Sequence, residues 1–163
     1  LYAVGKAAGM SEQSLAQARK INAKNFEIVK SNLGTEEAYQ KLVENMSLSN
    51  LANNKQMERE LLTMLAPAYR YFMRIEPELY LAKINIPVFA AFGSLDIQVP
   101  ADSNLKSLHD LLPKHPKNVL KEYVGMNHLF QKATTGQLAE YADIEETINP
   151  QVMHDIAAWI KGL

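Results

Sequence analysis

Two residues of this sequence have the types and the spacing that acid–base chemistry requires. Asp96 lies in the loop G-S-L-D-I-Q-V-P after the apolar run 86–92, and His128 lies in the loop G-M-N-H-L-F-Q after the run 119–124. When a carboxylate accepts a hydrogen bond from one ring nitrogen of a histidine, the other ring nitrogen is free to act as a base. Spacing alone leaves a second interpretation open, in which Asp96 forms a turn or cap and His128 is structural.

The segments before the two loops have the patterns of strands. Run 86–92 is almost continuously apolar, which is typical of a strand buried on both faces of a parallel sheet, whereas run 119–124 alternates. A helix is expected at 102–112 between them, so the order predicts a parallel pair with a crossover connection. Ligands of such sheets bind at the carboxyl ends of the strands, where both loops would lie. A last helix is expected to begin at Asn149-Pro150.

The N-terminal half has the texture of helices only. Residues 11–74 are rich in Ala, Leu, Glu, Lys and Gln, and their apolar positions recur with helical periodicity. We expect one helix from a cap at Ser11 to an end at Gly34, and a second from a cap at Thr35 to the turn-forming run 47–54. A third stretch, 56–73, should be interrupted at Pro67. The predicted organisation is a helical region at 1–81 and an α/β region at 82–163, mostly helical by residue count.

The stretch from residue 86 to residue 159 resembles the C-terminal part of the α/β-hydrolase superfamily. Its motifs are the strand I-P-V-F-A-A-F-G, the two loops quoted above, and a continuation at Thr135-Gly136, Glu140-Tyr141, Ile148-Asn149-Pro150 and Trp159-Ile160. Within that superfamily it looks closest to bacterial serine hydrolases of the esterase and serine-aminopeptidase-like type. The resemblance implies that Asp96 is the acid and His128 the base of a catalytic triad, and that residues 1–81 form the helical lid.

The nucleophile of such a triad is not recognisable in the sequence. Ser11, in G-M-S-E-Q, lacks the second glycine of G-x-S-x-G, and Ser94 lies inside the acid loop. Capping and turn formation explain these two serines better. Because the family's chain order is Ser, Asp, His, we expect the serine and the oxyanion loop before Leu1. We therefore expect a C-terminal fragment that is inactive alone, consistent with 163 residues where this fold needs about 250.

The resemblance implies hydrolysis of a carboxylic ester, or of a thioester or amide, through an acyl-enzyme. The alternative from another class is a hydrolase-like binding or interaction module without catalysis. Self-association through the exposed strand edge beside 86–92 is a further expectation. Three neighbours of the pair could assist: Met126 by touching an acyl group, and Asn127 and Gln98 by orienting the loops.

Composition excludes several other classes. Lys and Arg number 17 against 18 Asp and Glu, which gives nucleic acid no electrostatic reason to bind. The apolar runs are well below the roughly 18 residues that span a bilayer, so no membrane span is expected. The chain has no cysteine, which excludes thiolate zinc sites and cysteine nucleophiles. His109, His115 and His154 lack ligand spacing, so we expect no metal and no cofactor.

Overall fold

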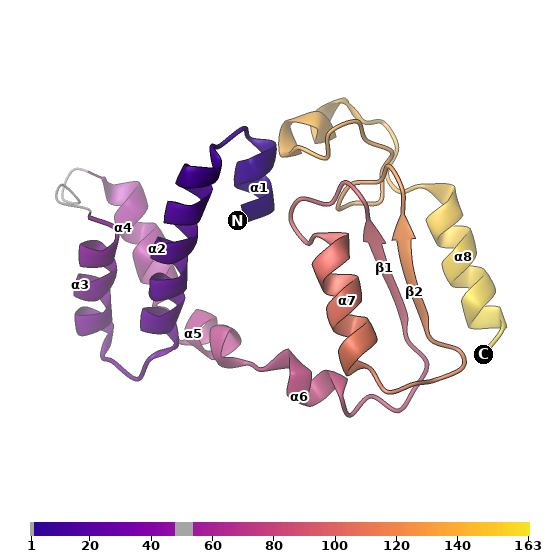
Figure 1. The fold of residues 1–163 in the computed structure, drawn as a ribbon, viewed down its shortest axis with the longest axis horizontal. Helices are drawn as coiled ribbons and strands as arrows, with labels where there is room; N and C mark the ends of the chain where they lie inside the picture. The colour runs from indigo at the N-terminus through magenta and orange to yellow at the C-terminus, as the bar shows by residue number, and fades with distance from the viewer. Residues whose placement is uncertain (1, 48–53) are drawn as a thin grey trace. The chain divides into compact units, whose positions relative to one another are not determined.

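A computed structural model describes residues 2–47 and 54–163, so most of the predicted turn 47–54 lies outside the described residues. The chain divides into two compact units (Figure 1). Residues Ser11–Glu76 form the helical unit, and residues 2–10 together with Pro77–Leu163 form the sheet unit. The division lies before α6 (Pro77–Leu81), which the predicted boundary at 81/82 assigned to the helical region. Helix α1 (Tyr2–Ala7) also belongs to the sheet unit, so the helical unit is an insertion within it.

The helical unit contains α2 (Glu12–Lys30), α3 (Thr35–Asn45), α4 (Lys55–Met64) and α5 (Pro67–Arg74). The predicted cap at Ser11 is confirmed, because its hydroxyl accepts from the backbone N–H of Ser14 at 3.2 Å. The predicted break at Pro67 is also confirmed, since this proline is the first residue of α5. The predicted cap at Thr35 is wrong: Gly34 has the extended cap conformation, and its carbonyl accepts from the N–H of Ala38 at 2.9 Å.

The first long helix also ends earlier than predicted. Helix α2 stops at Lys30, because both the N–H and the hydroxyl of Ser31 donate to the carbonyl of Ile28, at 3.2 and 2.6 Å. This local hydrogen bonding replaces the helical pattern at a residue type that competes well for backbone groups.

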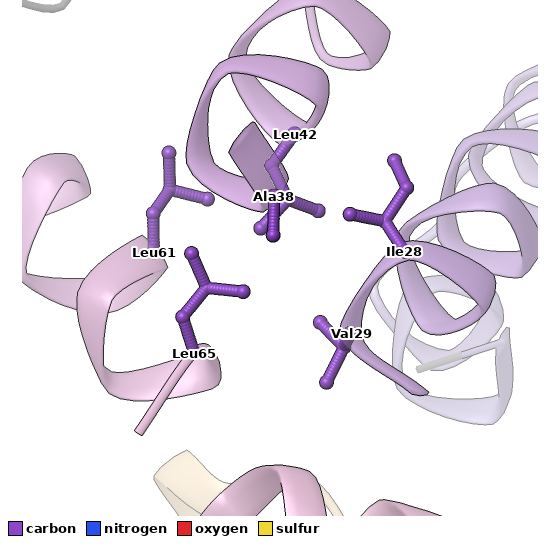
Figure 2. Packing of buried hydrophobic residues seen from close by; sticks show 6 residues of the cluster. All are labelled: Ile28, Val29, Ala38, Leu42, Leu61 and Leu65. Carbon is purple, nitrogen blue, oxygen red and sulfur yellow. The ribbon is translucent and has the colours of Figure 1, made fainter. Parts of the chain in front are cut away.

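The core of the helical unit is a cluster of buried apolar side chains from three consecutive helices and the cap of α4 (Figure 2). Its six members are Ile28, Val29, Ala38, Leu42, Leu61 and Leu65. Beside it, the buried Arg70 of α5 donates to the carbonyls of Val29 and Leu33, at 3.0 and 2.9 Å. Arg70 and Arg74 both donate to the carbonyl of Ser31, so the two arginines satisfy the C-terminal carbonyls of α2.

The sheet unit contains β1 (Phe89–Gly93), α7 (Ala101–Leu111), β2 (Val119–Tyr123), the 3₁₀ helix η2 (Leu138–Asp143) and α8 (Pro150–Lys161). The two strands pair in parallel, with Phe89 opposite Val119 and Gly93 opposite Tyr123. The predicted parallel pair, its crossover helix and the terminal helix starting after Asn149 are confirmed.

Strand β1 is shorter and less buried than the sequence predicts. Pro87 cannot donate to a ladder, the N–H of Val88 is bound by the side chain of Asn118, and Ile86 is 66% exposed. Helices α7 and α8 cover opposite faces of the pair (Figure 1), but most residues of β1 stay half-buried. The expectation of a strand buried on both faces is therefore wrong for the described residues, because a two-stranded sheet leaves every strand at an edge.

Helix α8 packs on the sheet through aromatic and apolar contacts. The rings of Phe89 and Trp159 lie 5.6 Å apart, and Val152 is buried with Tyr123 and Met126. In the part of the chain that the structure describes, no helix combines the length and apolarity needed to cross a membrane.

Candidate active site

The acid loop leaves β1 in close contact with the histidine loop. A Cβ atom on Gly93 would lie 2.2 Å from the carbonyl oxygen of Met126, so only glycine fits at the end of this strand. The N–H of Ser94 donates to the carbonyl of Tyr123, and that of Leu95 to the carbonyl of Met126, both at 2.9 Å. These backbone contacts fix the two loops against each other.

Asp96 is a buried carboxylate whose two oxygens have different partners. Its Oδ1 accepts from the backbone N–H groups of Gln98 and Val99, at 2.9 and 2.8 Å. Its Oδ2 lies 2.8 Å from Nδ1 of His128. The Asp96 side chain is only 5% exposed, whereas that of His128 is 39% exposed. The structure therefore brings the two predicted residues together, with the acid inside and the histidine toward solvent.

The contact between Asp96 and His128 gives the two ring nitrogens of the histidine different roles. A carboxylate oxygen accepts hydrogen bonds, so the short distance between Asp96 and His128 fits the tautomer in which Nδ1 is the donor. The neutral ring then has its lone pair at Nε2, the nitrogen that can accept a proton from another group. Among the described residues, no side-chain hydroxyl hydrogen-bonds to this histidine.

The segment that follows His128 is held by a carboxylate, that of Glu140, whose role no sequence pattern predicts. Glu140 accepts from the backbone N–H groups of Thr134, Thr135 and Gly136 and from the Thr135 hydroxyl. These donors, the Thr134 N–H first among them, lower the pKa of Glu140 to about 2. The resemblance motif contained Glu140, but nothing in its spacing revealed four donors.

The same segment also contacts the acid loop. The hydroxyl of Tyr141 accepts from the side chain of Gln98 at 3.2 Å, and Gly136, at φ +72°, lies so close to Leu95 that a Cβ would meet its carbonyl oxygen at 1.9 Å. Gln98 was predicted to orient the loops. Its backbone N–H binds Asp96 and its side chain donates to Tyr141, and the orienting role of Gln98 stays a prediction.

A second ionisable cluster lies on the α8 side of the sheet. Asp155 accepts from Lys121 at 2.5 Å and from the Tyr123 hydroxyl at 2.9 Å. Burial, and then the hydrogen bond to Asp155, raises the pKa of Tyr123 to about 12. The hydrogen bond from Lys121, followed by that from Tyr123, lowers the pKa of Asp155. The cluster ties α8 to β2.

The other candidate residues have structural partners. Ser11 caps α2, as predicted, whereas the hydroxyl of Ser94 accepts from the N–H of Gly125 in the histidine loop, at 2.8 Å. Met126 is buried with Tyr123 and Val152, and its contact with an acyl group in an assembled site stays a prediction. No group of three or more metal-ligating side chains occurs within residues 2–47 and 54–163.

Comparisons of the chain with models of protein families, with curated proteins and with solved structures gave no match. The chemistry of this site is therefore inferred from the Asp96–His128 pair and from the loops that hold it.

Proposed function

We propose that this chain is the lid and C-terminal part of an α/β-hydrolase that cleaves carboxylic esters, with thioesters and amides as further substrates. The observation that carries this proposal is the 2.8 Å hydrogen bond between Nδ1 of His128 and Oδ2 of the buried Asp96. It is the contact between acid and base that a Ser-His-Asp triad requires.

Each of the two residues has a defined role in this reaction. Nε2 of His128 takes the proton of a serine hydroxyl as the serine attacks the ester carbonyl, and returns it to the leaving alcohol. The same nitrogen then takes a proton from the water that attacks the acyl-enzyme, and returns it to the serine oxygen as the acyl–serine bond breaks. Asp96 holds the ring in the tautomer with Nδ1 protonated, and stabilises the imidazolium in both steps.

The serine and the oxyanion donors are proposed to lie outside the described residues. Ser94 is the serine nearest in sequence to Asp96, but its hydroxyl is bound to Gly125 at 2.8 Å. The geometry of this pair therefore supports the acid and base of a triad whose nucleophile comes from elsewhere in the protein.

Within residues 2–47 and 54–163, no strand pairs with the edge of β1 that faces away from β2, which supports a larger sheet. Hydrogen bonds to β2 involve the carbonyl of Val88 and the N–H of Ser94, so alternate residues between them direct their backbone groups away from β2. Further strands of the proposed hydrolase core would pair with this edge. The rival occupant is a second copy of the chain, and sedimentation of the 163-residue chain as a monomer at high concentration would exclude it.

The helical unit is the proposed lid. It has its own apolar core and is inserted between residues 10 and 77 of the sheet unit, which is how a lid is added to a catalytic domain. A core of its own allows the insertion to fold as a separate unit, which supports the proposed role as a lid.

A fluorophosphonate probe, which labels activated serines, tests this proposal. We expect no serine labelling of the 163-residue chain, and labelling of the polypeptide encoded by the complete reading frame. His128→Ala in that polypeptide should abolish labelling, whereas the control His154→Ala, at an exposed histidine, should not. Serine labelling of the 163-residue chain, or undiminished labelling after His128→Ala, would contradict the proposal. Absence of labelling in the complete polypeptide would favour the non-catalytic binding module.

A further inference from the structure

The turn that carries His128 is built around a buried amide. The side chain of Asn127 is fully buried, and its Oδ1 accepts from the backbone N–H groups of Leu129 and Gln131, both at 3.0 Å. Its Nδ2 donates to Oε1 of Gln131 at 2.8 Å. The backbone closes the same turn, because the N–H of Asn127 donates to the carbonyl of Gln131 at 3.0 Å.

This amide holds the backbone on both sides of a strained residue. Phe130 has φ +57°, in the left-handed region that bulky side chains rarely adopt. Such a conformation persists only where its surroundings determine it, and these residues cluster at functional sites. The two N–H groups bound by Asn127 belong to the residues before and after Phe130. The ring of Phe130 also packs edge-on against Tyr123, at 5.9 Å between centroids.

Gln131 extends the turn to the start of α8. Its Nε2 donates to the carbonyl of Glu146 at 2.7 Å, and the carbonyl of Phe130 accepts from the N–H of Asn149 at 2.9 Å. Asn149 is the N-cap of α8, with its Oδ1 accepting from the N–H of Gln151 at 3.0 Å. The turn is therefore fixed to the N-cap of α8 and to the loop just before it.

The His128 side chain is 39% exposed, so the backbone that carries it contributes to where its ring points. We propose that Asn127 and Gln131 are positioning residues that hold this turn so that Nδ1 of His128 meets Asp96. This role rests on the proposed function, because proton transfer to and from a serine requires Nε2 of His128 to be held in position. A loop packed only for stability would not need His128 in one fixed tautomer. The tautomer of His128 therefore distinguishes a positioning role from general packing.

Nitrogen-15 NMR of the 163-residue chain measures that tautomer directly, at a pH of about 8, where free histidine side chains are neutral. We expect wild type to show His128 protonated at Nδ1, and folded Asn127→Ala to lose the downfield Nδ1–H signal and populate both tautomers. The matched control is Asn118→Ala, which removes another amide that binds a backbone N–H in the same unit, that of Val88 at 2.9 Å, and should keep the signal. Loss of the signal in both variants, or in neither, would overturn the inference.

A second variant keeps the test decisive if Asn127→Ala does not fold. Gln131→Leu leaves both backbone hydrogen bonds of Asn127 Oδ1 in place and removes only the side-chain contacts of Gln131. We expect a weaker Nδ1–H signal, and an unchanged one would contradict the role of this pair. If wild type itself lacks the signal, the triad proposal fails, whereas persistence of the signal in the variants removes only the positioning inference.

Discussion

The helical unit and the sheet unit are stabilised by different interactions. The helical unit has six buried apolar side chains in one cluster, whereas the buried cluster beneath the site loops has only three, namely Tyr123, Met126 and Val152. The loops of the sheet unit are fixed instead by carboxylates and amides that bind backbone N–H groups, as Asp96, Asn127 and Glu140 do. Apolar packing places helices, while directional hydrogen bonds fix the loop atoms that chemistry needs.

The largest expected effect comes from the core of the helical unit. Leu42→Ala removes a fully buried side chain and should lower the free energy of unfolding of this unit by about 2–5 kcal/mol. Urea unfolding followed by circular dichroism measures the loss, and the His128 Nδ1–H signal should persist in the sheet unit. The control is Leu62→Ala on α4, where the leucine is half-exposed. Loss of the His128 signal together with the helices would show that the two units are not separately stabilised.

The sheet unit should respond most to a change at its tightest backbone contact. In Gly93→Ala, the new Cβ would meet the carbonyls of Met126 and Asn127, and overpacking of this kind costs about 1–3 kcal/mol. The same variant should weaken the Asp96–His128 contact, because both loops must separate. Gly162→Ala is a control in ordinary van der Waals contact, with an expected change within about 0.5 kcal/mol. An unshifted urea midpoint for Gly93→Ala would contradict the close approach of the loops.

Arg70 is the exception within the apolar unit, so it tests how far the comparison holds. Lysine cannot reproduce the forked donation to the carbonyls of Val29, Ser31 and Leu33, and Arg70→Lys should cost about 1–2 kcal/mol. Thermal unfolding of the helical unit measures this. Arg59→Lys, at an exposed arginine of α4, should leave the midpoint nearly unchanged. Equal midpoints for the two variants would mean that the C-terminal end of α2 does not depend on the hydrogen bonds from Arg70.

The smallest effect should be confined to the loop after His128 and to acid pH. Hydrogen bonds lower the pKa of Glu140 from 4.5 to about 2, so its contribution to stability is present above about pH 4.5 and is lost as the pH falls toward 2. The backbone amide signals of Thr135 and Gly136 should shift over that window in wild type. In Glu140→Gln they should not, whereas the control Glu145→Gln should behave like wild type. Wild-type amide signals that do not shift over this pH range would contradict the hydrogen bonds from these residues to Glu140.

Sequence patterns predicted most elements because their signals are local. Pro67, the Asn149-Pro150 start and the alternation at 119–124 each mark an element in their own window. The short helices α1, α6 and η2 were missed, because five or six residues carry too little periodicity.

The site was predicted only as a pair of residue types at matching loop positions. The contact between Asp96 and His128 follows from two loops at the same ends of parallel strands. Asn127 was named as an orienting residue, but its bonds across Phe130 depend on a positive φ that no pattern announces. The hydrogen bonds to Glu140 likewise depend on how the backbone of residues 134–136 turns.

The central claim, that Asp96 and His128 are the acid and base of a hydrolase, is tested most directly by ester hydrolysis. The measurement is kcat for p-nitrophenyl butyrate with the polypeptide of the complete reading frame, comparing Asp96→Asn with the control Asp110→Asn at a half-exposed aspartate of α7. Loss of the acid should misorient the histidine and lower kcat by about 10⁴-fold, while the control stays near the parent value. Hydrolysis by Asp96→Asn at the parent rate would contradict the account.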